Sequence, residues 1–113
     1  MVFIPEFFAC ILLFFYACGC VEDYREFVEK AHAAHCKVAV DADIMSLALL
    51  VPPGEWGADI VFGSTQRLGI PLFYGGPSAA YFATRDEYKR NMPGRIICWS
   101  KDKYGKLAYR MAL

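Results

Sequence analysis

Four polar side chains follow one apolar run of the sequence and could bind a ligand or a partner. They come directly after residues 59–62, a predicted strand, and are Ser64, Thr65, Gln66 and Arg67. Hydroxyl, amide and guanidinium groups donate hydrogen bonds, and α/β proteins place their sites at the carboxyl ends of strands. A capped loop without a ligand is an equal alternative, because such side chains also bind backbone groups.

A glycine turn follows these residues, with Tyr74 before Gly75 and Gly76. Glycine has no side chain, so the backbone there can approach a ligand or a neighbouring protein surface closely. A tight turn between two strands is the other interpretation. We include Tyr74, Gly75 and Gly76 among the candidate site-facing residues.

Two acids, Asp41 and Asp43, follow another apolar run at residues 37–40. A carboxylate at a strand end can pair with a cationic ring nitrogen. Helix capping is the favoured interpretation of both, because aspartate is a preferred N-cap residue.

Metal and disulfide chemistry has little support in the sequence. The two histidines, His32 and His35, have no Asp or Cys placed in the sequence to form a metal site or a catalytic pair, so we assign them no chemistry. The cysteines form no CxxC pair and predict free thiols; they are Cys10, Cys18, Cys20, Cys36 and Cys98.

The elements that must position these residues alternate between helix and strand. Apolar residues at intervals of three and four predict an amphipathic helix over residues 21–34. Further apolar runs predict strands at 37–40, 59–62 and 79–84 and a short helix at 44–51. Residues 85–91 predict a polar helical turn, and residues 95–99 and 106–111 predict a hairpin. The fold class is α/β, with a mixed or mostly parallel sheet, flanking helices and a C-terminal β-hairpin.

The charge balance argues against a nucleic-acid partner. Twelve basic side chains match twelve acidic ones in a chain of 113 residues, which is one domain in length. No overall positive field exists to attract a phosphate backbone or an anionic membrane surface.

The first twenty residues form an apolar leader with a single charge, Glu6. Its run from Phe7 to Tyr16 is short for a membrane span, which needs about 20 apolar residues. Three interpretations are open: a poor signal or anchor, a buried strand or helix, or sequence that does not belong to the domain that follows. We favour the third, which makes residues 1–20 an anchor or a gene-model artefact and residues 21–113 the domain.

Five sequence blocks resemble one enzyme family. The blocks are PPGEWGAD, GSTQRLGIP, YGGP, ATRDEYKR and MPGRI, in this order and at close spacing. They are similar to the glycine dehydrogenase (decarboxylating) family, the P-protein of the glycine cleavage system. The resemblance covers residues 21–113, and the leader, His35 and Cys98 depart from it. The chain resembles a fragment of the N-terminal half of such a protein.

The resemblance implies an oxidoreductase of glycine catabolism with the large domain of a fold type I pyridoxal phosphate enzyme. Glycine is decarboxylated on the cofactor, and its aminomethyl group passes to the lipoyl arm of the H-protein. The compartment would be the cytoplasm in bacteria, which we favour, or the mitochondrion in eukaryotes.

Gln66 stands where the active half of this family has its cofactor lysine. An amide cannot form a Schiff base. The resemblance therefore implies that the cofactor lysine lies outside this chain, in a second half that is its partner, and that this chain holds no catalytic residue and is inactive alone. The alternative is a truncated, membrane-tethered binding domain without a catalytic role.

Overall fold

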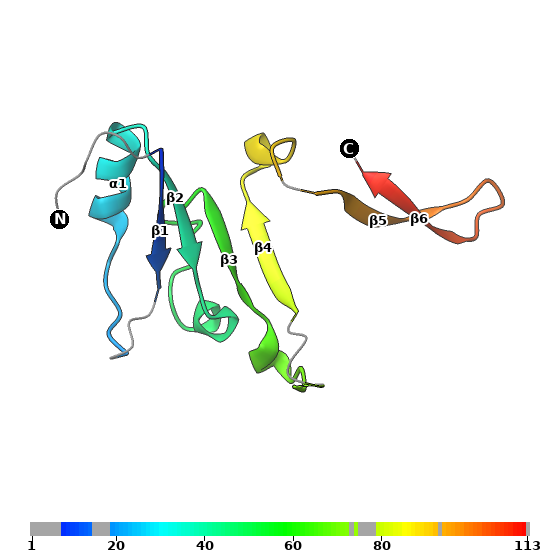
Figure 1. The fold of residues 1–113 in the computed structure, drawn as a ribbon, viewed down its shortest axis with the longest axis horizontal. Helices are drawn as coiled ribbons and strands as arrows, with labels where there is room; N and C mark the ends of the chain where they lie inside the picture. The colour runs from blue at the N-terminus through cyan, green and yellow to red at the C-terminus, as the bar shows by residue number, and fades with distance from the viewer. Residues whose placement is uncertain (1–7, 15–18, 73, 75–78, 93, 113) are drawn as a thin grey trace.

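The fold is built on a four-stranded sheet with the order β1-β2-β3-β4 (Figure 1). The computed structural model describes residues 8–14, 19–72, 74, 79–92 and 94–112. The first three strands are parallel and the fourth runs antiparallel to the third. These strands are β1 (Ala9–Leu13), β2 (Lys37–Asp41), β3 (Ile60–Ser64) and β4 (Ala80–Thr84).

Helices connect the strands, and a hairpin follows them. The α-helix is α1 (Arg25–Ala33), and short 3-10 helices are η1 (Ile44–Ala48), η2 (Gln66–Leu68) and η4 (Asp86–Tyr88). The hairpin consists of β5 (Ile96–Lys101) and β6 (Leu107–Ala112), which form a separate antiparallel sheet. The predicted α/β class, the mostly parallel sheet and the C-terminal hairpin are confirmed.

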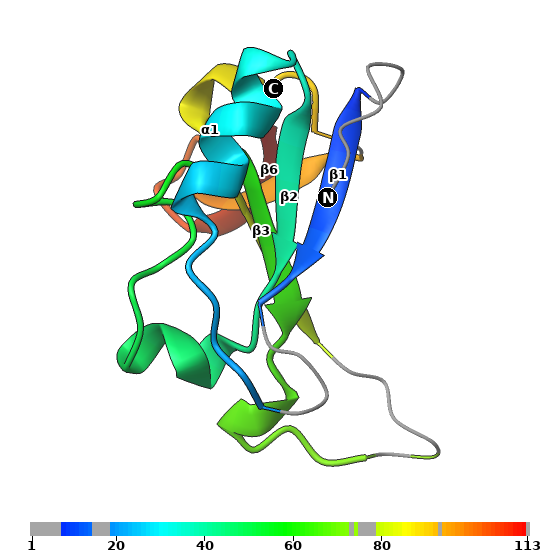
Figure 2. The ribbon, with the colours of Figure 1, turned by 90° about the vertical axis from the view of Figure 1, so that its left-hand side faces the viewer.

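Helix α1 packs on one face of the sheet (Figure 2). Its inner side buries Val28 and Ala31 against Val38 and Val40 of β2. Valines two residues apart on a strand point to the same face, so the pleat of β2 presents both to the helix. The helix begins at Arg25, later than predicted, and the Arg25 N–H is bound by the Asp23 carboxylate at 3.1 Å.

Residues 9–13 of the leader belong to this sheet. Strand β1 pairs with β2 in parallel register, and its Cys10 and Leu12 pack against the core under α1. The favoured interpretation, in which the leader stands apart from the domain, is therefore wrong for this segment. The buried-strand interpretation holds there, because alternate side chains of the apolar run reach the core. Cys18 lies outside the described residues, and none of the helices in the described ranges is long and apolar enough to cross a membrane.

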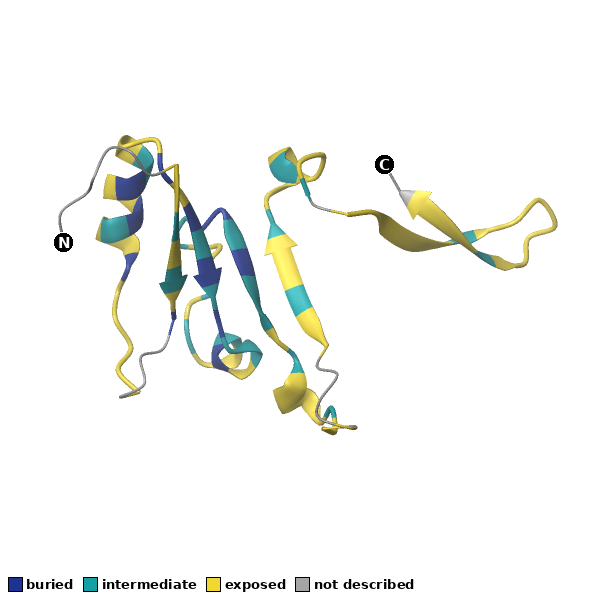
Figure 3. Ribbon diagram, viewed as in Figure 1, coloured by how far each residue is buried: buried dark blue, intermediate teal, exposed yellow. Residues whose placement is uncertain are grey.

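The hairpin projects from the rest of the chain (Figure 1). The radius of gyration is 17.5 Å, against about 13 Å expected for a compact chain of this length. Figure 3 shows that buried residues gather on α1, β2 and β3, whereas the hairpin is exposed along most of its length. The core therefore lies between α1 and the parallel strands.

Candidate functional site at the carboxyl edge of the sheet

The carboxyl ends of β2 and β3 bring several of the polar residues named above to one edge of the sheet, which we call the carboxyl edge. Asp41 is the last residue of β2 and lies beside Phe62 of β3 in the register. Ser64 ends β3, and the chain then turns into η2. Because the two strands are parallel neighbours, Asp41, Asp43 and the loop at 64–67 share this edge.

An ion pair joins the loop after β2 to the loop after β3 at this edge. The Arg67 guanidinium, 69 % exposed, pairs with the Asp43 carboxylate, 27 % exposed. The other carboxylate oxygen of Asp43 accepts the N–H of Met45 at 2.9 Å, at the start of η1. The predicted helix-capping role is therefore confirmed for Asp43. It is wrong for Asp41, which sits within β2, where no helix begins.

The loop from Ser64 to Gln66 is held by its own side chains. The Ser64 hydroxyl accepts the N–H of Gln66 at 3.1 Å, and the Thr65 hydroxyl donates to the Ala79 carbonyl at 2.8 Å. These contacts are those of a capped loop. The Gln66 side chain stays exposed at the edge, where it is accessible to a partner.

Tyr74 is fully exposed and has a φ of 42°, in the left-handed region. Gly75 and Gly76, the other candidate residues of this turn, lie outside the described residues.

Gly63 is a residue of this edge that the sequence analysis missed. A Cβ atom at this position would lie 2.1 Å from the Ala42 carbonyl oxygen, so only glycine fits. The same carbonyl accepts the Tyr81 hydroxyl at 2.6 Å, and burial, followed by the charges of Asp41 and Asp43, raises the pKa of Tyr81. A glycine inside a strand pattern signals such a close approach.

The carboxyl edge holds no amine among the described residues. The lysines are in α1, at the opposite end of β2, after η4 and in the hairpin: Lys30, Lys37, Lys89, Lys101, Lys103 and Lys106. Pyridoxal phosphate needs a lysine for its covalent attachment. The residues present at this edge therefore do not fit a covalently held cofactor.

A second polar cluster lies at the amino edge of the sheet, around Asp59. Its carboxylate accepts the His32 Nε2–H and the Val38 N–H, each at 2.9 Å, and the Tyr88 hydroxyl at 3.1 Å. Burial favours a higher pKa for Asp59, but the hydrogen bonds from Val38, His32 and Tyr88 lower it overall.

The sequence analysis did not find this Asp59 partner of His32. The two residues are 27 positions apart in the sequence, and only the fold joins them. The Lys37 ammonium adds a hydrogen bond to the Tyr88 hydroxyl, which raises the pKa of Lys37. The cluster ties α1, β2 and η4 together, and a hollow of about 390 Å³ lies beside it.

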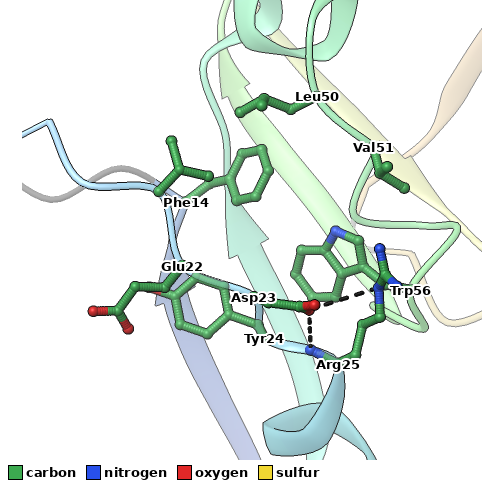
Figure 4. Close-up of a pocket in the computed structure, with 9 residues that line it drawn as sticks. Phe14, Glu22, Asp23, Tyr24, Arg25, Leu50, Val51 and Trp56 are labelled. Atoms are coloured by element: carbon green, nitrogen blue, oxygen red, sulfur yellow. Dashed lines mark hydrogen bonds and ion pairs between the residues drawn. The ribbon is translucent and has the colours of Figure 1, made fainter.

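A third feature is an aromatic hollow near the start of α1 (Figure 4). Its volume is about 270 Å³, and the Trp56 ring lies 6.0 Å from the ring of Phe14 and 6.1 Å from that of Tyr24. Within the residues that the structure describes, no group of three or more potential metal ligands is present.

Comparisons with known proteins agree with one another on the family. A family model described as "Glycine cleavage system P-protein" matches residues 2–113, so the match includes the leader that the sequence analysis set apart. A glycine dehydrogenase (decarboxylating) of Bacteroides fragilis is 78 % identical over 111 residues, which are 98 % of this chain and 12 % of that protein. The protein of the same name in Bacteroides thetaiotaomicron is 79 % identical over 109 residues, 96 % of this chain and 12 % of that protein.

More distant relatives agree. A mitochondrial glycine dehydrogenase (decarboxylating) of Dictyostelium discoideum is 51 % identical over 111 residues, 98 % of this chain and 11 % of that protein. A crystal structure of glycine decarboxylase (P-protein) of the glycine cleavage system, in inhibitor-bound form, superimposes with a TM-score of 0.82 and 36 % identity. The match covers 96 % of this chain and 25 % of that one. The chain thus spans about an eighth of the length of the Bacteroides relatives.

Proposed function

The chain belongs to the glycine cleavage system P-protein family, and we propose that it is a segment of the first half of a glycine dehydrogenase (decarboxylating). The whole enzyme would decarboxylate glycine with pyridoxal phosphate and pass the aminomethyl group to the lipoyl arm of the H-protein. In this proposal the cofactor supplies the electron sink, and this chain supplies a scaffold without catalytic residues.

One observation supports the proposal that this chain is a scaffold and that the cofactor lysine lies elsewhere in the protein. Gln66 lies at the carboxyl edge of the parallel strands, where α/β enzymes place their sites, and has an amide where covalent attachment needs an amine. The lysines of the chain lie elsewhere, and Lys37 is engaged with Tyr88 at the opposite edge. The cofactor lysine is therefore proposed to lie in a second half of the protein, outside this chain.

The proposal assigns a role to the remaining site residues. Ser64, Thr65, Gln66 and Arg67, with Tyr74, Gly75 and Gly76, would face the lysine-bearing half. The Arg67–Asp43 ion pair supports this role because it fixes the direction of the loop that carries Gln66. The high identity to Bacteroides proteins supports a bacterial cytoplasmic enzyme.

Borohydride labelling tests the proposal that this chain has no lysine for covalent attachment of pyridoxal phosphate. The purified chain, incubated with pyridoxal phosphate and reduced with borohydride, should show no pyridoxyl-lysine by mass spectrometry. The variant Gln66→Lys should gain one label at residue 66, because it returns an amine to the strand end. Leu68→Lys is the matched control, since Leu68 is exposed in the same short helix, and it should stay unlabelled.

Two results would contradict the proposal. One is a stoichiometric label on a lysine of the unmodified chain. The other is glycine-dependent release of carbon dioxide by this chain without a companion.

A further inference from the structure

The β5–β6 hairpin shares few interactions with the rest of the chain. Among the described residues, its strands pair only with each other, and none of its side chains packs on the core under α1. Its described side-chain hydrogen bonds stay within it: Arg95 bonds to the Met111 sulfur, and Asp102 accepts the N–H of Lys106 at 2.9 Å. Over the described ranges, no hydrogen bond, ion pair or core contact therefore couples the hairpin to the sheet.

Local interactions hold the hairpin together. Trp99 lies opposite Tyr109 in the register, and their rings meet edge to face with centroids 6.4 Å apart. Both side chains stay exposed, at 74 % and 70 %, so their pairing removes little apolar surface from water. A two-stranded hairpin is at best marginally stable alone in water. We therefore expect a small free energy of opening for β5–β6.

The core under α1 is stabilised differently. Val28, Val38 and Val40 are almost fully buried, and β2 pairs with a strand on each side. Proteins open locally in cooperative units, and the units with few buried apolar contacts open most easily. The free energy of opening should therefore be much larger for β2 than for the hairpin.

The boundary between the two units lies after η4. The Tyr88 hydroxyl donates to the Asp59 carboxylate at 3.1 Å and accepts a hydrogen bond from the Lys37 ammonium, which ties η4 to the sheet. Gly94 lies between η4 and β5 and has a φ of 87°. A Cβ atom added at Gly94 would meet nothing within 4 Å, so neighbouring atoms do not confine the backbone there. The chain is thus fixed up to η4 and unconfined at Gly94, just before the hairpin.

We propose that the β5–β6 hairpin is an arm that opens as a unit of its own, while the sheet, α1 and η4 stay folded. Opening breaks the ladder between β5 and β6 and separates Trp99 from Tyr109, whereas Tyr88 stays bound to the sheet. This opening needs no second half of the protein, so it is independent of the proposed function.

Hydrogen exchange of this chain at low concentration, mapped by mass spectrometry of its fragments where reclosing outpaces exchange, tests the proposal. Trp99→Ala should speed exchange at the hydrogen-bonded amides of β5 and β6 by about 2- to 12-fold, the effect of losing an aromatic pair, and should leave β2 unchanged. Val28→Ala should speed exchange in β2 by about 30-fold, because it leaves a cavity in the core, and should leave the hairpin unchanged. Arg110→Ala, on the exposed opposite face of β6, is the matched control and should change neither unit.

Urea below the unfolding transition gives the same contrast without a variant. Because opening the core exposes more surface than opening the hairpin, exchange in β2 should rise more steeply with urea than exchange in β5 and β6. Equal slopes would overturn the proposal, as would a response of both units to Trp99→Ala or to Val28→Ala. Hairpin amides that exchange as fast as those of an unfolded peptide would also overturn it, because the arm would then have no closed state.

Discussion

At the scale of single residues, the carboxyl edge of the sheet depends on positions where only one type of residue fits. Gly63 is the clearest of them, because the Ala42 carbonyl occupies the place of a side chain. The same carbonyl accepts the Tyr81 hydroxyl, so the carboxyl ends of β2 and β3 and the start of β4 meet at one point. The geometry of the candidate site is thus set by the backbone as much as by its polar side chains.

Gly63→Ala should therefore destabilise the chain. The new methyl group would sit 2.1 Å from a backbone oxygen, and the strands must separate to accept it. We expect a loss of about 1–3 kcal/mol in the free energy of unfolding, the usual cost of overpacking. Chemical denaturation measures it. Gly54→Ala is the control, because a Cβ atom added there meets nothing within 4 Å, and equal stability of the two variants would contradict the expected clash.

The lowered pKa of Asp59 makes the stability of the fold depend on pH. Folding lowers the pKa of Asp59 below its ordinary value of 3.8. The ionised carboxylate therefore stabilises the folded state, and this stabilisation is present in full at pH values above 3.8. The contribution is lost as the pH falls below 3.8 towards the lowered native pKa. Unfolding free energies of the parent chain should therefore drop in this acidic range.

Asp59→Asn removes this titration. The variant should be less stable at neutral pH by about 1–3 kcal/mol, because the donors of Val38, His32 and Tyr88 lose their charged acceptor. Its stability should also change less than that of the parent as the pH is lowered from about 5 to about 3. Parallel pH profiles for both chains would show that Asp59 is not the responsible group.

At the scale of elements, the packing of α1 decides whether the strand ends are positioned at all. Val28→Ala should cost about 2 kcal/mol of stability, because the side chain is 2 % exposed and its removal leaves a cavity over β2. Thermal unfolding followed by circular dichroism measures the loss. Glu29→Ala, at the neighbouring exposed position of the same helix, should be close to neutral. If both variants unfold alike, α1 does not pack as described.

At the scale of the whole molecule, one sheet face is left for other protein to cover. Ile11, Leu13 and Phe82 are 71 %, 54 % and 46 % exposed on the face opposite α1. Parallel sheets are covered on both faces in α/β proteins. The relatives are far longer than this chain, so further protein is available to cover this face.

The isolated chain should accordingly self-associate. We expect light scattering to rise with concentration and an apolar dye such as ANS to bind, and the double variant Ile11→Ser, Leu13→Ser to reduce both signals. Leu49→Ser is the control, because Leu49 is 88 % exposed outside the sheet. A parent chain that stays monomeric and binds no dye would show that this face needs no cover.

Much of the fold follows from local patterns in the sequence. The spacing of Val28 and Ala31 predicts the inner side of α1, and the alternation in 37–40 predicts β2, because helix and strand periods are properties of the backbone. The turn residues Asp102 and Gly105 likewise mark the hairpin correctly. Five ordered sequence blocks sufficed for the family, which the comparisons confirm.

The sequence by itself thus determined most of the elements, the fold class and the family. Tertiary structure alone decided that part of the leader is strand β1, that His32 is bound to Asp59, and that Gly63 lies against Ala42. Such contacts join residues far apart in the chain, and no local pattern encodes them. They depend on which faces meet when the strands pair, and that is fixed only once the whole sheet has formed.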